Sequence, residues 1–386
     1  MLVRRGTQAI LALGAVLMLA AAPNETLSLK DITQLNVAGF GDHANRYAFS
    51  MAVYKDALYV GTLNVKNMPA MFNFAAAMRM GSATEGAEIW RYDQDGTWTR
   101  VVEKGLGRPA NFGVRKLLAV GDCLYGVTAN HDQGMEVWRT CDGTKWEAVA
   151  DRGFGDKHNT SGRGLGAFNG AIYVGTENRS HGAQIWRSAD GKKWERVIDK
   201  GLGDPKNVWV SELVEFKGEL YLGTLNSKGG QVFRSHDGEH YELVATAGLS
   251  DKHNRGVMKL IVFKDRLFLS TLNFSQGACL FLSEDGAAFT PVIEQGLISK
   301  ANAYIWQLQE YSGRLYAGTY NHRIPPTGGF MLFSSDDGQE WKIENTDGFG
   351  DRGYYGIRTM SLFHGRLIIG TASARYGAKV YSAQGK

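Results

Sequence analysis

NGAIYVGTENRSHGAQIWRSADGKKWERVIDKGLGDPKN, residues 169–207, holds one copy of a pattern that the chain repeats. Its central run occurs in seven forms: LYVGT at 58–62, LYGVT at 124–128, IYVGT at 172–176, LYLGT at 220–224, LFLST at 267–271, LYAGT at 315–319 and LIIGT at 367–371. The final threonines lie about 48 residues apart, except for the first two, which are 66 apart. Such a period indicates a repeat fold whose units bury their apolar faces against one another.

Each repeat unit reads as four short strands. In the quoted unit we expect strands at 163–168, 171–176, 183–187 and 193–198, where β-branched and aromatic residues are frequent. Pairs such as Asn169-Gly170 separate the first two strands, and glycine supplies the positive φ that a tight hairpin needs. Seven such units predict an all-β fold, a seven-bladed β-propeller with four antiparallel strands in each blade.

The two ends of the chain are expected to meet. The last unit has strand patterns at 356–363, 366–371 and 378–382 and then lacks a fourth. Residues 31–38, followed by GFGD at 39–42, match the fourth strand and connector of the other units. We therefore predict that the N-terminal strand completes the last blade, which leaves no open sheet edge at the seam.

The first 22 residues predict a secretory signal peptide. Arg4 and Arg5 precede an apolar run at 9–19 and three alanines at 20–22. We expect a secreted or periplasmic protein whose residues 23–386 form a single propeller. An uncleaved signal that anchors the chain to a membrane is the alternative, although the run is shorter than the roughly 20 residues of a membrane span.

Charge and cysteine content narrow the partners and the redox state. The net charge is +4 over 386 residues, and the positive residues are scattered, so we expect no nucleic-acid partner. If a hairpin joins the strands that carry Cys123 and Cys141, these residues lie nearly opposite each other. They are then either a disulfide, which an oxidising compartment permits, or two unpaired thiols.

The turns after the third strands carry a resemblance. They read TCDGTKW (140–146), SADGKKW (188–194), SHDGEHY (235–241), SEDGAAF (283–289) and SSDDGQEW (334–341). These resemble the Asp-box (BNR-like) turns, S-x-D-x-G-x-x-W, of sialidase-type secreted propellers, although only 334–341 has the full spacing. The resemblance implies a propeller fold, with the turn acting as a folding device away from the ligand face.

The connectors between units form a second series, which includes GFGDHAN (39–45), GFGDKHN (153–159) and GLGDPKN (201–207). They resemble tandem repeats of microbial surface proteins. We expect their Asp and Asn side chains to hydrogen-bond the connector backbone. Each connector offers fewer oxygens than the six to eight ligands that calcium takes, so we predict no metal and no other cofactor.

Differences between the copies point to a ligand site. The copies can be aligned on the first residue of the repeated run, a leucine or an isoleucine. Nine residues before it, four of the first strands carry Arg115, Arg163, Trp306 and Arg358. In another copy, Glu212 lies one position after the aligned residue. Three convergent arginines can clamp a carboxylate or sulfate through paired hydrogen bonds. The alternative is that each arginine pairs with a nearby carboxylate or carbonyl.

The connectors and the loops after the second strands share one face of a propeller, where ligands usually bind. We expect His158, His253, His322 and Tyr304 to contribute there. Residues 65–85 form an insertion in the first blade, in which the segment 68–80 carries four methionines and two phenylalanines. This insertion is expected to act as a lid, a plug or a docking surface for a protein partner.

Three functions remain open. The first is binding of a glycan or an anionic small molecule at the channel mouth. The second is a glycoside hydrolase or lyase that acts on an anionic saccharide, and the third is a protein-interaction scaffold that uses the Met-rich loop. Glycoside hydrolysis needs two positioned carboxyls, and only Glu212 is acidic at the aligned positions. The sequence therefore favours binding, and it assigns no catalytic residue.

Overall fold

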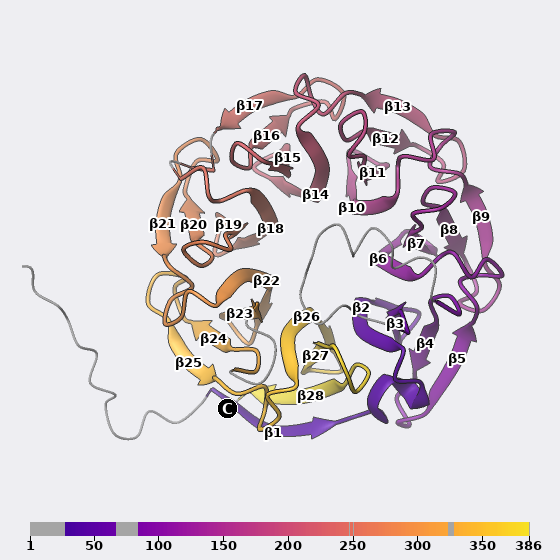
Figure 1. The fold of residues 1–386 in the computed structure, drawn as a ribbon, viewed down its shortest axis with the longest axis vertical. Helices are drawn as coiled ribbons and strands as arrows, with labels where there is room; N and C mark the ends of the chain where they lie inside the picture. Colours follow the sequence, from indigo (N-terminus) through magenta and orange to yellow (C-terminus); the bar gives the residue numbers. More distant parts are fainter. Residues whose placement is uncertain (1–27, 67–83, 247, 250, 323–327, 386) are drawn as a thin grey trace, which may run out of the picture.

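The computed structural model describes residues 28–66, 84–246, 248–249, 251–322 and 328–385. Apart from one short 3-10 helix, η1 (Ala38–Gly41), its regular elements are β-strands arranged in a ring (Figure 1). In this part of the chain no helix is long and apolar enough to cross a membrane. The predicted signal peptide, the Met-rich segment 68–80 and part of the loop 321–329 lie outside the described residues.

The strands fall into antiparallel sets of four. In the quoted unit these are β10 (Ser161–Phe168), β11 (Ala171–Glu177), β12 (Ile185–Ser188) and β13 (Glu195–Ile198), paired in chain order. Each begins and ends within about two residues of the predicted strand, because the alternation of apolar residues and the turn glycines already mark these boundaries.

The other sets repeat this order. The innermost strands are β2 (Asn45–Tyr54), β6 (Gly113–Val120), β10, β14 (Asn207–Phe216), β18 (Gly256–Phe263), β22 (Asn302–Tyr311) and β26 (Tyr354–Phe363). The second strands are β3 (Ala57–Asn64), β7 (Cys123–Ala129), β11, β15 (Glu219–Asn226), β19 (Arg266–Leu272), β23 (Arg314–Asn321) and β27 (Arg366–Ser373). The third strands are β4 (Ile89–Tyr92), β8 (Val137–Thr140), β12, β16 (Val232–Ser235), β20 (Leu280–Ser283), β24 (Leu332–Ser335) and β28 (Val380–Gly385). The outermost strands are β5 (Trp98–Val102), β9 (Glu147–Ala150), β13, β17 (Glu242–Ala245), β21 (Thr290–Ile293), β25 (Lys342–Asn345) and β1 (Leu29–Gln34).

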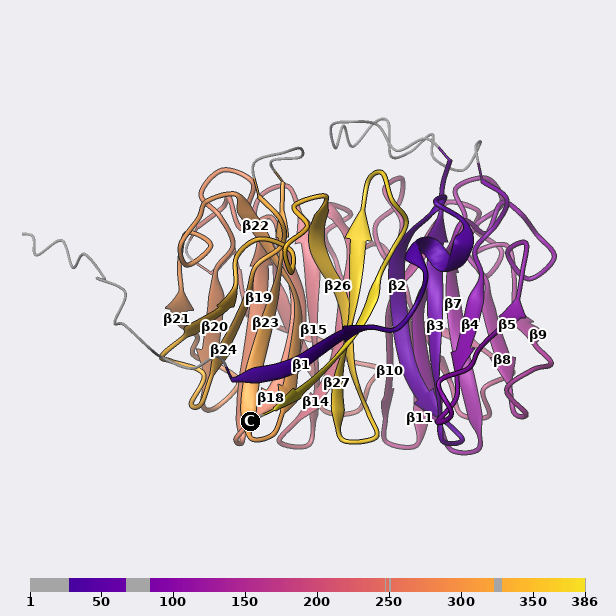
Figure 2. The ribbon, with the colours of Figure 1, turned by 90° about the horizontal axis from the view of Figure 1, so that it is seen from below.

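The ring is closed at two levels. The second strand of each set also pairs with the innermost strand of the next, and β27 returns to β2 through Ala372 and Tyr47. On the outside, β1 pairs antiparallel with β28, with Leu29 opposite Gly385 (Figure 2). The N-terminal strand therefore completes the last set, as the sequence predicts.

A buried asparagine organises six of the seven connectors; in the connector before β26, Tyr354 stands at the equivalent position. The Asn159 amide donates to the Gly153 carbonyl (2.8 Å), and its Oδ1 accepts from Thr176 Oγ1 and Asn178 Nδ2 (both 3.0 Å). Asp156 adds a bond to the His158 backbone N–H (2.9 Å). The expected hydrogen-bonding role of the connector Asp and Asn is confirmed, and it ties the connector to the end of β11.

In five of the six turns that follow a third strand, the glycine lies against the preceding unit; the exception is Gly96, after β4. Gly191 has φ +68°, and a Cβ there would overlap the hydroxyl of Tyr125 in β7. The same overlap recurs for four further pairs, Gly143 with Tyr59, Gly238 with Tyr173, Gly286 with Tyr221 and Gly338 with Phe268. The aromatic residue of the repeated run therefore needs a glycine in the turn of the next unit, because a larger residue there would overlap its ring.

The second set of strands carries a disulfide. It joins Cys123, the first residue of β7, to Cys141, which follows β8. Among the described residues the free cysteine is Cys279, which is partly buried, and burial raises its pKa. It is therefore poorly suited to react as a thiolate at neutral pH.

We predict that Gly191→Ala destabilises the fold more than Gly170→Ala. Both positions have positive φ, at +68° and +73°, which costs alanine about 1–2 kcal/mol. Only Gly191 contacts a neighbouring side chain, so its substitution adds about 1–3 kcal/mol of overpacking. Denaturant unfolding of the two variants measures the difference, and equal losses would contradict the contact between units.

We predict that reduction of the disulfide lowers the free energy of unfolding by about 3 kcal/mol, the loop-closure value for a separation of 18 residues. Denaturation with and without reductant measures this loss. The sensitivity to reductant should persist in Cys279→Ser and vanish in the double variant Cys123→Ser/Cys141→Ser. Sensitivity that remains in the double variant would contradict the assignment.

Candidate functional site

The innermost strands carry a β-bulge at the same place in every unit. In β6, Val114 pairs with Thr128 and Lys116 with Val127, which leaves Arg115 as an extra residue. The equivalent residues elsewhere are Phe49, Arg163, Trp306 and Arg358, together with the pairs Ser211-Glu212 and Met258-Lys259. A regular strand sends consecutive side chains to opposite faces, whereas a bulge re-aims them. Two neighbouring side chains therefore reach the centre of the ring.

These side chains line a cavity of about 230 Å³. The strands that carry them surround the centre of the ring (Figure 1). The charged lining of the cavity consists of five cations and one acid, namely Arg115, Lys116, Arg163, Lys259, Arg358 and Glu212. The structure thus brings together five of the residues that the sequence singles out: the three arginines, Trp306 and Glu212.

Two of the arginines flank one aromatic ring. The guanidinium carbons of Arg115 and Arg358 lie 4.6 and 4.7 Å from the centre of the Phe49 ring, and Arg358 also lies 5.1 Å from Trp306. Arg358 is only 9% exposed. The Nε atoms of both arginines are buried without a hydrogen-bond partner. Within the described ranges neither arginine has a carboxylate at ion-pair distance.

Burial lowers the pKa of Arg358 to about 10, and the positive charge of Arg163 adds to this effect. The group is still a cation at neutral pH. Glu212 offsets this desolvated charge only from a distance, and no acid in the described chain contacts it. Such a charge is costly unless something pairs with it. An anion in the cavity that these guanidinium groups line would supply that partner.

Glu212 lies between two lysines. Its carboxylate oxygens are 2.8 Å from Lys116 Nζ and 3.2 Å from Lys259 Nζ. Burial alone would raise the pKa of Glu212, but the two ammonium groups outweigh that effect and hold it below its ordinary value. Burial lowers the pKa of Lys116 to about 8, against the opposing pull of Glu212. Glu212 is therefore a carboxylate at neutral pH and cannot serve as a proton donor.

Arg163 is locally paired, unlike the other two arginines. The Arg163 guanidinium binds Glu177, which also accepts a hydrogen bond from Arg179 Nε at 2.8 Å. The same guanidinium lies 3.8 Å from the centre of a Trp209 ring. The expected alternative of local pairing thus holds for Arg163. This arginine is a fixed part of the wall, and it leaves Arg115 and Arg358 as the groups with unused donors.

An aromatic layer lies on the connector side of this cavity. Tyr304 stacks on Trp306 with 5.7 Å between ring centres, and Tyr320 packs against both. The hydroxyls of Tyr47 and Tyr355 are 2.5 Å apart. Tyr304 is 8% exposed, and burial raises its pKa, so it is a neutral packing residue rather than an activated nucleophile. It does not line the cavity.

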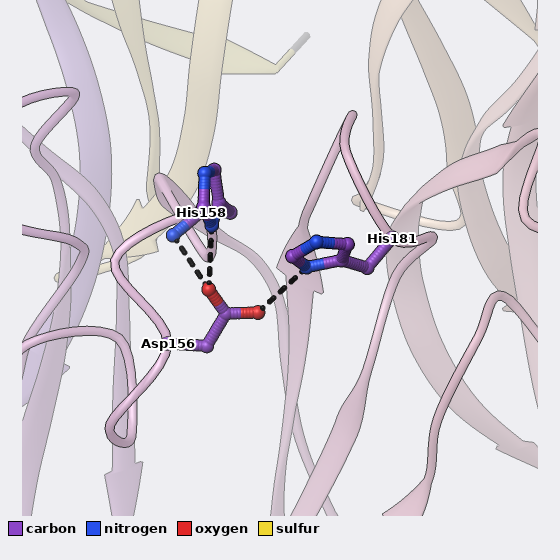
Figure 3. Close-up of side chains that lie close together, drawn as sticks. All are labelled: Asp156, His158 and His181. Atoms are coloured by element: carbon purple, nitrogen blue, oxygen red, sulfur yellow. Dashed lines mark hydrogen bonds and ion pairs between the residues drawn. The ribbon is translucent and has the colours of Figure 1, made fainter.

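The three expected histidines also lie away from the cavity. His158 and His253 contact the connector carboxylates of Asp156 and Asp251, at 2.9 and 2.8 Å, and His322 Nδ1 contacts the Ala301 carbonyl at 2.9 Å (Figure 3 shows His158). The histidines and the arginines therefore lie in different parts of the structure. The connector hydrogen bonds hold the histidines in their own loops.

Lys116, Lys259 and Phe49 belong to the cavity but were not among the expected site residues. In the repeat alignment, Phe49 occupies the position of the arginines, and Lys116 and Lys259 occupy the position of Glu212. This alignment was the sequence signal that could have identified them as site residues. Simple strand alternation places residues such as Arg115 and Lys116 on opposite faces. Only knowledge of the bulge shows that both side chains reach the same space.

No protein-family model matches the chain, and no curated protein matches its sequence. Three solved structures resemble it in fold. Raptor from Chaetomium thermophilum has a TM-score of 0.57 at 13% identity, covering 94% of this chain and 29% of that one. Saccharomyces cerevisiae Sqt1 has a TM-score of 0.53 at 10% identity, covering 91% and 100%. An ancestral GH74 enzyme has a TM-score of 0.57 at 11% identity, covering 87% and 47%.

A fourth structure is itself titled a β-propeller domain, that of the Trilobed protease from Pyrococcus furiosus. It has a TM-score of 0.50 at 9% identity and covers 89% of this chain and 95% of that one. At these identities the likeness concerns the fold alone. The chain spans less than a third of Raptor and about half of the GH74 enzyme.

We predict that Glu212→Gln lowers the free energy of unfolding by about 3 kcal/mol at pH 7, because two buried ammonium groups lose their counter-charge. The loss should shrink as pH rises through about 8, where Lys116 gives up its proton. Denaturant unfolding between pH 6 and 10 measures this trend. Glu242→Gln, which breaks an exposed pair with Arg234, is the control and should change stability by less than about 1 kcal/mol. A loss for Glu212→Gln that is independent of pH would contradict the assignment.

Proposed function

We propose that this chain is a seven-bladed Asp-box propeller, exported from the cytoplasm, that binds an anionic small molecule or an acidic glycan in its central cavity. One observation supports the binding proposal above the others. Arg115 and Arg358 flank Phe49, with buried donors that no group in the described residues accepts from. A carboxylate or sulfate is the ligand that satisfies paired guanidinium groups.

The size of the cavity limits the ligand. Its volume of about 230 Å³ is below the roughly 300–1,000 Å³ of sites that take drug-sized molecules. A small anion, or one terminal acidic sugar of a longer glycan, fits this space better than an extended chain does. Trp306 and Phe49 offer aromatic surface beside the charged groups, as a sugar ring requires.

The glycan part of the proposal rests on the Asp-box resemblance of the turns at 188–194 and 334–341 and of their equivalents. The Ser188 hydroxyl and the backbone N–H groups of Lys192 and Lys193 donate to Asp190, as such a turn requires. One of the structures with a similar fold is titled a GH74 enzyme. Because the two sequences are only 11% identical, this likeness supports a propeller fold more strongly than it supports a carbohydrate ligand.

A lyase that acts on an anionic saccharide is the second candidate, and Lys116 is the observation that favours it. A lysine with a pKa of about 8 accepts a proton near neutral pH more readily than an ordinary lysine does. A glycoside hydrolase is disfavoured, because the described lining holds one carboxyl and that group is ionised. Turnover of a uronate-containing glycan that is lost in Lys116→Met would support the lyase, whereas binding without turnover supports the first function.

A protein partner that docks on the Met-rich segment 68–80 remains a prediction from the sequence. Export likewise rests on residues 1–22. Both segments lie outside the described residues, so the cavity argument depends on neither of them.

We predict that Arg358→Met weakens anion binding at least tenfold while leaving the fold as stable as before, or more stable. The buried guanidinium stacks on rings but has no acidic partner, so the methionine avoids its desolvation cost. A glycan array of sialylated, uronate-containing, sulfated and neutral glycans identifies the ligand. Calorimetric titration with the best glycan then measures the affinity.

The matched control is Arg196→Met, because Arg196 lies on the outer strand β13, half exposed, 3.6 Å from Asp199. It should bind as the wild type does. Equal binding by the wild type and Arg358→Met, or a preference for neutral glycans, would contradict the proposed site.

We predict that the affinity for the acidic ligand falls as pH rises through about 8, because Lys116 then loses its charge within the cavity. Titrations from pH 6 to 9.5 at constant ionic strength measure this dependence. Lys116→Met should bind more weakly at pH 7 and show no step near pH 8. A step that persists in this variant would assign the pH dependence to another group.

A further inference from the structure

Two histidines and an aspartate meet at one point between two loops. Asp156 and His158 belong to the connector before β10, and His181 belongs to the loop after β11 (Figure 3). Asp156 Oδ1 lies 2.9 Å from His158 Nδ1, and Asp156 Oδ2 lies 3.2 Å from His181 Nδ1. The two imidazole rings are 4.9 Å apart in an edge-to-face arrangement. One ligand atom from each of the three residues lies within 4.8 Å of the others.

The repeat shows that the scaffold does not require this combination. Asp251 and His253 make the same contact in the connector before β18, at 2.8 Å, but the residue equivalent to His181 there is Gln276. In the connector before β14, Lys206 replaces the first histidine. The connector aspartate is therefore a structural residue in several units, whereas the pair of histidines around it belongs to one unit.

We infer that Asp156, His158 and His181 bind a divalent transition metal of the zinc class. Two imidazoles and one carboxylate suit zinc, nickel or copper, whereas calcium and magnesium prefer oxygen ligands alone. The sequence predicts no metal because each connector by itself offers too few ligands. The third ligand comes from a different loop, which only the fold brings close.

The geometry requires a small closure. Zinc–nitrogen bonds of about 2.0–2.1 Å in a tetrahedral site place the ligand atoms about 3.3 Å apart. A separation at the 4.8 Å limit would contract by about 1.5 Å, whereas the two Asp156–imidazole contacts, at 2.9 and 3.2 Å, would lengthen slightly. The side chains of His158 and His181 are 43% and 55% exposed, which leaves them room to turn. The fourth position of a tetrahedral site faces solvent, because both histidines lie on the surface of the connector face.

The carboxylate is prepared for this role. Donors from the protein hold the carboxylate in place, among them the His158 backbone N–H, 2.9 Å from Oδ1. Another of these donors is Asn178 Nδ2, 3.0 Å from Oδ2, which also bonds the buried Asn159. A metal at this position would therefore tie the connector and the loop after β11 together, beside the asparagine that already joins them.

The experiment is titration of the full, untagged chain with Zn²⁺ after treatment with a chelator, followed by competition against a chromophoric chelator of known affinity. We expect one zinc ion per chain and a rise in Tm on zinc addition. His181→Gln should weaken zinc binding at least tenfold and abolish the rise in Tm. This substitution reproduces Gln276 of the related unit, so it is expected to fold, and circular dichroism checks this.

The control is His253→Gln, which removes a histidine with the same aspartate contact from a unit that lacks the second histidine. It should bind zinc as the wild type does. Wild-type affinity in His181→Gln, or an equal loss in His253→Gln, would overturn the assignment. Binding of Ca²⁺ in preference to Zn²⁺ would overturn it as well.

Discussion

The structure depends on one buried asparagine in six of its seven connectors. The side-chain amides of Asn45, Asn111, Asn159, Asn207, Asn254 and Asn302 each donate to the carbonyl of the glycine that begins the turn, at 2.8–3.0 Å. These asparagines are at most 1% exposed. A buried polar group without a hydrogen-bond partner costs about 1–3 kcal/mol, so the asparagine and the groups that it hydrogen-bonds must occur together. This constraint fixes where six of the seven innermost strands begin.

With its start fixed, each innermost strand carries its bulge at the same height in the ring. The glycine, serine or valine of the second strand faces the bulge, and a Cβ at Gly175 or Gly318 would overlap the neighbouring Val210 or Ile357. The scaffold thus specifies the position of the bulge but not the side chains that project from it. Those side chains vary from phenylalanine to arginine to glutamate, so the binding chemistry is independent of the packing that holds the ring together.

The sequence predicts the scaffold well and the site in part. Strand positions and the pairing of β1 with β28 follow from the repeat, because each unit encodes the same turns and alternation. The aligned arginines and Glu212 meet as expected. The expected histidines do not line the cavity, because His158 and His253 bond aspartates two residues before them in their own connectors and His322 bonds the Ala301 carbonyl. Lys116 and Lys259 were missed because a bulge breaks the alternation on which the prediction of strand faces rests.

The central claim is that the two arginines on either side of Phe49 hold an anion. A crystal structure of the protein soaked in bromide, with anomalous data, tests it most directly because it needs no knowledge of the natural ligand. The account predicts an anomalous peak within contact distance of the Arg115 and Arg358 guanidinium groups, present in the wild type and absent in Arg358→Met. Peaks confined to surface lysines, with none in the central cavity, would contradict it.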